Sequence, residues 1–195
     1  LLEHAITPIQ QYSYTTGKNA TDSAMIIDAM DMLHTNKVDG FCIVSSDSDF
    51  TRLAIRLREA GMLVIGIGER KTPQPFIVAC DKFIYIEIIG RTDESKDEYS
   101  ANTEASNSVH IEKVNKELIK LLKISVEDLA DDAGWAFLGD VGNLINKKKP
   151  DFDSRNYGFA KLTPLFKSLS KDFEIDERDA DKRGLIKHIY VKVKD

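Results

Sequence analysis

DGFCIVSSDSDFTRLAIRLREAG, residues 39–61, is the stretch of this sequence that decides its fold. It opens with a short apolar run, residues 40–45, which is typical of a strand buried on both faces. After an acidic turn, Phe50, Leu53, Ala54 and Leu57 fall at helical spacing, and a glycine ends the pattern. A buried strand that leads directly into an amphipathic helix predicts one unit of a parallel sheet.

The segments on either side continue this alternation. The further expected elements are a helix over residues 21–34, strands over residues 62–68 (MLVIGIG) and 82–89 (KFIYIEII), and a weaker strand candidate over residues 8–14 (PIQQYSY). A chain that alternates strand, helix, strand, helix and strand favours right-handed crossovers. We therefore predict an α/β domain with a Rossmann-like parallel sheet.

A polar segment then divides the chain. Residues 91–108 (RTDESKDEYSANTEASNS) carry almost no large apolar side chains, which is typical of a solvated linker. We expect one domain over residues 1–90 and another over residues 109–195. The second domain has helical candidates in residues 109–124, 135–146 and 157–169, and a final hairpin of residues 173–175 with 186–193. Three helices with a terminal hairpin predict a small α+β winged helix.

Composition narrows the class of protein. Hydrophobic residues make up 42% and charged residues 30% of the chain, which is ordinary for a globular protein. No apolar run approaches the roughly 18 residues of a membrane span, and the first ten residues show no basic region before an apolar run. We therefore expect a cytoplasmic protein with no membrane segment. Cys42 and Cys80 lie in apolar contexts and are expected to be buried free thiols.

The charge is unevenly distributed along the chain. The net charge is −5, but residues 109–195 hold 17 Lys and Arg against 16 Asp and Glu, whereas residues 1–90 hold 8 against 11. The second domain is therefore the better candidate for contact with phosphate. The four histidines are scattered, and none is paired with a cysteine at metal-ligand spacing. Any bound metal must be held by oxygen.

Three aspartates are placed where such a metal would bind. Ligands of open parallel sheets lie beyond the carboxyl ends of the strands, and Asp47 and Asp49 directly follow the strand of residues 40–45. Asp22 stands at the start of its own helix. Clustered carboxylates suit Mg²⁺, which can polarise a phosphodiester and activate a water. The alternative from spacing alone is that these aspartates only cap helices, a position that Asp favours.

The first half of the chain resembles a known nuclease family. The run GKNATDSAMIIDAMD, the decisive stretch itself, a glycine-containing strand and IVACDKFIYIE together resemble the NYN domains of the PIN-like ribonuclease superfamily, in the LabA-like bacterial branch. The match covers most of residues 1–89, and SSDSDF is its most specific part. The resemblance implies a metal-dependent ribonuclease in which Asp22, Asp47 and Asp49 bind Mg²⁺ or Mn²⁺ and cut RNA, with Ser46 near the phosphate.

Two further expectations belong to this half. Lys18 and Asn19 precede Asp22 in a glycine-containing loop and are candidates for contact with phosphate oxygens. The resemblance also places a strand, with another metal-binding aspartate, and a helix before Leu1. We therefore expect the sheet to be truncated at its N-terminus and this fragment to be less stable and less active than a longer chain.

The second half resembles the OST-HTH/LOTUS domain over residues 109–193. The residues that carry this resemblance are Trp135, GDVGNLINKKKPDF, RNYGFAKLTPLFKSL and HIYVKV. It implies a partner that is RNA or another protein. Pro164 fits best if its helix starts near Thr163. The candidate RNA contacts are the basic residues interleaved with aromatic ones: Lys147, Lys148, Lys149, Arg155 and Lys161.

Two other functions stay open at this point. Asp47, Asp49 and Thr51 also fit the DxDxT motif of haloacid-dehalogenase-like phosphatases, in which Asp47 would attack phosphorus. That family requires Ser or Thr at the end of the next strand, where this chain has Gly66-Ile67-Gly68-Glu69. The non-enzymatic alternative is a catalytically inactive RNA-binding or regulatory adaptor, which would not need all three aspartates.

Overall fold

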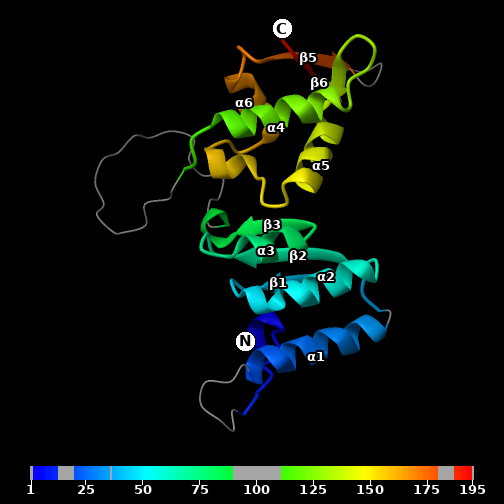
Figure 1. The fold of residues 1–195 in the computed structure, drawn as a ribbon, viewed down its shortest axis with the longest axis vertical. Coiled ribbons are helices and arrows are strands. Elements are labelled where there is room, and N and C mark those ends of the chain that lie inside the picture. Colours follow the sequence, from blue (N-terminus) through cyan, green and yellow to red (C-terminus); the bar gives the residue numbers. More distant parts are fainter. Residues whose placement is uncertain (1, 13–19, 36, 90–110, 180–186, 195) are drawn as a thin grey trace, which may run out of the picture.

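A computed structural model describes residues 2–12, 20–35, 37–89, 111–179 and 187–194 of the chain. Two domains stack along the long axis of the molecule, and the chain passes from the lower domain to the upper one (Figure 1). Within these described ranges, no helix combines the length and apolarity needed to cross a membrane.

The N-terminal domain is built on a three-stranded parallel sheet. Its strands are β1 (Gly40–Val44), β2 (Leu63–Gly68) and β3 (Lys82–Tyr85), in the order β1-β2-β3. The first crossover contains the short helix η2 (Ser48–Phe50) and α2 (Thr51–Glu59), and the second contains α3 (Gln74–Ala79). The predicted α/β parallel sheet is confirmed.

This sheet is covered on one face. Leu53, Ala54 and Leu57 of α2 are buried together with Ile43 and Val64 from the neighbouring strands. On the opposite face, the side chains of Val44 and Leu63 are 64% and 53% exposed. The expectation that β1 is buried on both faces was therefore wrong. An apolar run shows that a strand can be buried, but only the placement of the helices decides which face is covered.

Two other predictions for this domain need correction. Residues 6–12 form no strand, while residues 13 and 14 of that candidate lie outside the described residues. The strand expected over residues 82–89 ends at Tyr85 and is followed by the short helix η3 (Ile86–Ile88). The helix expected over residues 21–34 is present as α1 (Ala20–His34), which contributes Leu33 to the core.

The C-terminal domain is a small α+β domain, whose described residues form three α-helices and a three-stranded antiparallel sheet. The elements are α4 (Lys116–Glu127), β4 (Trp135–Phe137), α5 (Leu138–Lys148), η4 (Ser154–Tyr157), α6 (Leu162–Ser168), β5 (Phe173–Asp179) and β6 (Lys187–Val193). The strand order is β4-β6-β5. The first turn of α6 contains Pro164, as expected.

The boundaries of two helices differ from the prediction. Trp135 belongs to β4 and not to a helix, because its strand pairs with β6 and the helix begins only at Leu138. The first helix begins at Lys116, since the Asn115 side chain accepts a hydrogen bond from the Leu118 N–H at 2.8 Å and caps it there.

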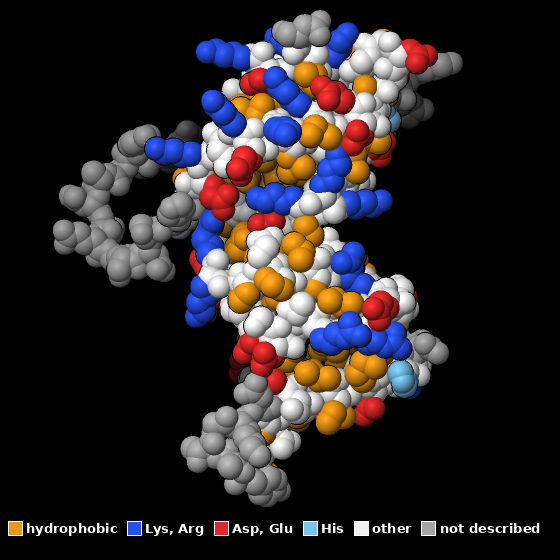
Figure 2. Space-filling view, in the orientation of Figure 1, with side chains coloured by type: hydrophobic (Ala, Val, Ile, Leu, Met, Phe, Trp, Pro, Cys, Tyr) orange, Lys and Arg blue, Asp and Glu red, His pale blue; other side chains and the backbone are white. Residues whose placement is uncertain are grey.

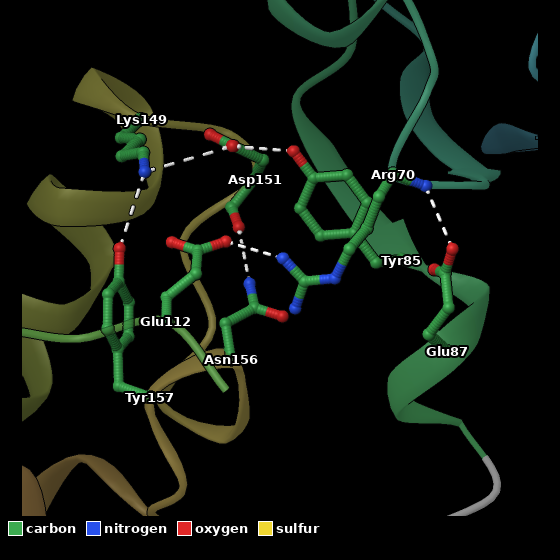
Figure 3. Close-up of polar contacts among 8 residues, drawn as sticks. All are labelled: Arg70, Tyr85, Glu87, Glu112, Lys149, Asp151, Asn156 and Tyr157. Atoms are coloured by element: carbon green, nitrogen blue, oxygen red, sulfur yellow. Dashed lines mark hydrogen bonds and ion pairs between the residues drawn. The ribbon is translucent and has the colours of Figure 1, made fainter. Parts of the chain in front are cut away.

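The two domains meet along β3 through polar contacts (Figure 3). The Phe83 N–H donates to the Pro150 carbonyl at 2.8 Å, and the Tyr85 hydroxyl donates to Asp151 Oδ2 at 2.9 Å. The Arg70 guanidinium lies over the Tyr85 ring, 5.2 Å from its centroid, and its Nη1 is 2.6 Å from Glu112 Oε1. Among the described residues, this main-chain bond and the side-chain pairs Tyr85–Asp151 and Arg70–Glu112 join the two domains.

At this interface the Tyr85 hydroxyl stays protonated at neutral pH and donates its hydrogen bond to Asp151. Burial raises the pKa of the Tyr85 phenol, and the neighbouring Asp151 carboxylate raises it further. Asp151 is buried, and its other oxygen, Oδ1, has no hydrogen-bond partner among the described residues. Lys149 Nζ lies 3.8 Å from Asp151 Oδ2, so the bond from Tyr85 is the shorter of the two contacts that compensate this carboxylate.

The first prediction concerns this bond. Tyr85→Phe keeps the ring but removes the donor, which leaves a buried carboxylate with poorer compensation. We expect the free energy of unfolding to fall by about 1 to 3 kcal/mol, measured by urea denaturation. Tyr12→Phe is the control, because Tyr12 is 64% exposed. Equal stability of the two variants would show that the Tyr85 hydroxyl contributes nothing to the interface.

The second prediction concerns the thiols. Both cysteines are free, but Cys42 is exposed and only Cys80 is buried, so the expectation of burial was wrong for Cys42. Burial raises the pKa of the Cys80 thiol to about 12, and the thiolate is the reactive form. At neutral pH we expect a water-soluble thiol reagent to modify one cysteine per folded chain. Cys42→Ser should abolish this reaction and Cys80→Ser should preserve it; rapid labelling of both thiols would contradict the structure.

Candidate functional site

Three carboxylates converge at the carboxyl end of β1. Asp22 lies in the first turn of α1, Asp47 is the N-cap of η2 and Asp49 lies within η2. One carboxylate oxygen from each residue lies within 4.8 Å of those of the other two. The structure thus brings together all three aspartates that the sequence singled out as metal ligands.

Local hydrogen bonds shape the turn that carries two of these acids. The Ser45 N–H donates to the Ile67 carbonyl at 2.9 Å, which extends the pairing of β1 with β2 by one residue. The Asp47 N–H then donates to Ser45 Oγ at 3.1 Å, and Asp47 Oδ1 accepts from the Asp49 N–H at 2.9 Å. Asp47 therefore does cap a helix, as the alternative from the sequence predicted. The capping bond orients the Asp47 carboxylate and uses Oδ1, not Oδ2.

Ser46 ties the ends of two strands together. Its Oγ accepts a hydrogen bond from the Glu69 N–H at 2.8 Å, and Glu69 directly follows β2. The hydroxyl that was expected near phosphate thus has a partner within the protein. Ser46 fixes the position of the acidic turn relative to the end of β2.

Gly68 and Ser45 are two supporting residues that sequence reasoning missed. A Cβ on Gly68 would lie 2.5 Å from the Ser45 carbonyl oxygen and 2.7 Å from Thr72 Oγ1, so any larger residue would push the acidic turn away from β2. A glycine inside a strand signals such a close approach of backbones. That signal was present in the sequence as VIGIG.

The electrostatics of the cluster suit a cation. Asp22 is half-buried, whereas Asp47 and Asp49 are exposed. Neither Asp22 nor Asp47 forms an ion pair with a lysine or arginine in the part of the chain that the structure describes. Carboxylates held this close repel one another, and a hard divalent ion relieves the repulsion. The oxygen-only donor set fits Mg²⁺ or Mn²⁺.

The other candidates of the N-terminal domain are not described. Lys18 and Asn19, expected near the phosphate, lie outside the described residues.

The basic residues of the C-terminal domain do not form one uninterrupted surface. Lys148 Nζ is 2.7 Å from Asp128 Oδ2, and Lys149 Nζ donates to the Tyr157 hydroxyl at 3.5 Å. Lys147 and Lys161 are exposed. In the view of Figure 2, lysine and arginine side chains on this domain are interspersed with aspartate and glutamate.

Arg155 is held by its neighbour Asp153. The Arg155 Nε and Nη2 atoms donate to the two carboxylate oxygens of Asp153 at 3.0 and 2.8 Å. Burial alone would raise the pKa of the Asp153 carboxyl, but the side-chain and backbone hydrogen bonds from Arg155 hold that pKa below its usual range. The aromatic residues interleaved with these cations are largely internal, since Phe152 and Tyr157 are buried.

Comparisons with protein-family models agree with this architecture. The NYN domain model matches residues 1–87, and the OST-HTH/LOTUS domain model matches residues 110–184. Among solved structures, the chain is similar to an uncharacterized protein from Nitrosomonas europaea solved by solution NMR. The two are 32% identical, the match covers 53% of this chain and 92% of that chain, and the TM-score is 0.38. A search of curated proteins returned no match.

Both family matches follow the order of the two domains seen in the structure, and the first contains all three converging aspartates. The chain therefore carries an NYN domain followed by an OST-HTH/LOTUS domain.

Proposed function

We propose that this protein is a metal-dependent ribonuclease that hydrolyses RNA phosphodiester bonds at Asp22, Asp47 and Asp49. The observation that carries the proposal is the convergence of these carboxylates at the carboxyl end of a parallel sheet. The NYN match over residues 1–87 supports it, because NYN domains have a PIN-like nuclease fold. The C-terminal domain would contribute RNA binding, as OST-HTH/LOTUS domains do.

The three aspartates would hold Mg²⁺ or Mn²⁺. Such an ion, when bound, polarises the phosphodiester and makes an attacking water more acidic. The protein's own contribution is to fix the ligands before the substrate arrives. Asp47 is oriented by its hydrogen bond from the Asp49 N–H, and the turn is anchored to β2 through Ser45 and Ser46. A preorganised ligand set loses little freedom when a cation binds.

The exposure of the site suits a polymeric substrate. Asp47 and Asp49 are exposed at the rim of the sheet, so a nucleic acid strand can cross the cluster without threading through a closed cavity. The same cluster would repel a phosphate backbone unless a cation intervened. Binding of RNA at this site should therefore require the metal.

The exposed cations of the C-terminal domain are the proposed phosphate contacts. Lys147 and Lys161 are exposed, whereas Lys148 forms its ion pair with Asp128. A lysine that already has a carboxylate partner must lose that partner before it can bind phosphate. We therefore assign more of the phosphate contact to Lys147 and Lys161 than to Lys148, Lys149 or Arg155.

The third prediction tests the metal ligands. Asp47→Asn and Asp49→Asn should each abolish metal-dependent cleavage of RNA, because each replaces an anionic ligand with a neutral side chain of almost equal volume. The measurement is cleavage of a mixed single-stranded and structured RNA with Mg²⁺, with Mn²⁺ and with chelator.

Asp31→Asn is the matched control. Asp31 is exposed on α1, nine residues after Asp22 and hence about half a turn away around the helix. This variant should cleave at the normal rate. Normal cleavage by the Asp47 or Asp49 variant at matched Mg²⁺ would reject the proposed site. Metal-independent RNA binding without cleavage by the unaltered chain would instead favour the inactive adaptor.

The fourth prediction concerns salt. Lys147→Ala should weaken RNA binding and reduce the slope of log affinity against log salt by about 1, as expected for the loss of one phosphate contact. Lys148→Ala should change the slope less, since its charge is already compensated by Asp128. Equal slopes for Lys147→Ala and the unaltered chain would remove Lys147 from the interface.

A further inference from the structure

The C-terminal sheet has one face turned away from its core. Ala136, Phe173 and Val191 point inward and are buried. Because side chains alternate along a strand, their neighbours lie on the opposite face. The residues of this outer face that carry rings are Trp135 and Phe137 on β4, and His188 and Tyr190 on β6.

These rings are gathered into one surface. The ring centroid of Phe137 is 5.1 Å from that of His188 and 5.9 Å from that of Tyr190. The guanidinium of Arg178 on β5 lies 4.1 Å from the centroid of Tyr190 and 5.3 Å from that of Trp135. We call these five residues the ring face: Trp135, Phe137, Arg178, His188 and Tyr190.

The ring face is open to solvent. His188 is exposed, and Trp135, Phe137 and Tyr190 are partly exposed. The outer face of an antiparallel sheet is ordinarily polar. Aromatic pairs across strands stabilise a sheet, but that role does not require a planar cation stacked over two rings. The Arg178 guanidinium already packs as a flat cation over the rings of Tyr190 and Trp135.

The charges around the ring face favour an anionic ligand. Lys192 Nζ donates to the Ala133 carbonyl at 2.8 Å, and Lys194 Nζ donates to the Ser170 carbonyl at 2.8 Å. Main-chain carbonyls thus position both ammonium groups, and neither pairs with a carboxylate within the described ranges. Two carboxylates lie on the same face. Asp176 accepts from Arg178 Nε at 2.8 Å, which neutralises its charge and orients the guanidinium, and Glu174 is exposed opposite Lys192. The cations Arg178, Lys192 and Lys194 outnumber these two acids.

We propose that the ring face binds unpaired bases of single-stranded RNA. Bases stack on aromatic rings and on arginine planes. Lys192 and Lys194 would contact the phosphates of the same strand. Bases in a duplex are stacked on one another and cannot also stack on these rings. The expected ligand is therefore an unpaired segment of RNA. The inference rests on the RNA-binding part of the proposed function and adds a location and a substrate class to it.

The chain offers its own reporter for this site. Trp135 is its only tryptophan, so intrinsic tryptophan fluorescence reports on the ring face alone. The full chain carrying Asp47→Asn, which blocks cleavage, is titrated with a labelled single-stranded oligoadenylate RNA and with a blunt RNA duplex of equal length. We expect saturable quenching of Trp135 by the single strand and little by the duplex, with the anisotropy of the label giving the affinity.

Two substitutions test the stacking itself. Tyr190→Leu keeps apolar bulk but removes the ring, and should weaken single-strand binding about tenfold. Arg178→Gln should weaken it too. The matched control is Lys167→Gln, because Lys167 pairs with Glu177 at 2.9 Å much as Arg178 pairs with Asp176. It removes the same charge from the opposite side of β5 and should bind RNA normally. Circular dichroism and thermal unfolding verify that each variant is folded.

The outcomes separate the inference from the proposed function. Tight binding of the single strand without quenching, or with unchanged affinity in folded Tyr190→Leu, would overturn the stacking site and leave RNA binding intact. Equal binding and quenching by the duplex would overturn the substrate class. Binding of neither RNA would overturn the inference together with the RNA-binding part of the proposed function. Metal-dependent cleavage by the chain with Asp47 intact reports on the nuclease part independently.

Discussion

The parallel pairing of β1 with β2 is the constraint on which the acidic site depends. Val44 pairs with Ile67, so the two strands end side by side, and the bonds of Ser45 and Ser46 carry that alignment into the turn. Gly68 lets the turn approach closely enough for these bonds to form. The register of β1 and β2 therefore determines where Asp47 and Asp49 lie.

The acidic turn was predictable because its signals are local. A buried strand, an acidic turn and an amphipathic helix follow one another within residues 39–61, and the carboxyl end of a parallel strand is where such acids meet. The convergence of Asp22 with Asp47 and Asp49 was implied by a family resemblance, since helix spacing alone does not say where α1 packs. The metal and the reaction remain proposals.

Features that depend on distant partners were not predictable. Cys42 is exposed because α2 and α3 both pack on the opposite face of the sheet. The strand position of Trp135 follows from pairing with Lys192, more than 50 residues later in the chain. The alternation in IKHIYVKV predicted a strand, yet the ring face forms only when β4 and β5 flank β6 in this register. Sequence reasoning therefore identified the basic segments but not the ring face.

The bond between Phe83 and Pro150 also affects how the molecule meets its neighbours. An unpaired strand edge is a template on which another chain can add a strand and begin to aggregate. At β3, the carbonyl of Pro150 occupies this edge. Proline has no N–H to offer in return, so within the described ranges this contact at β3 is a single main-chain hydrogen bond. The C-terminal domain thus acts as a cap on the sheet, and protection from intermolecular strand addition at β3 comes from a neighbouring domain and not from another strand.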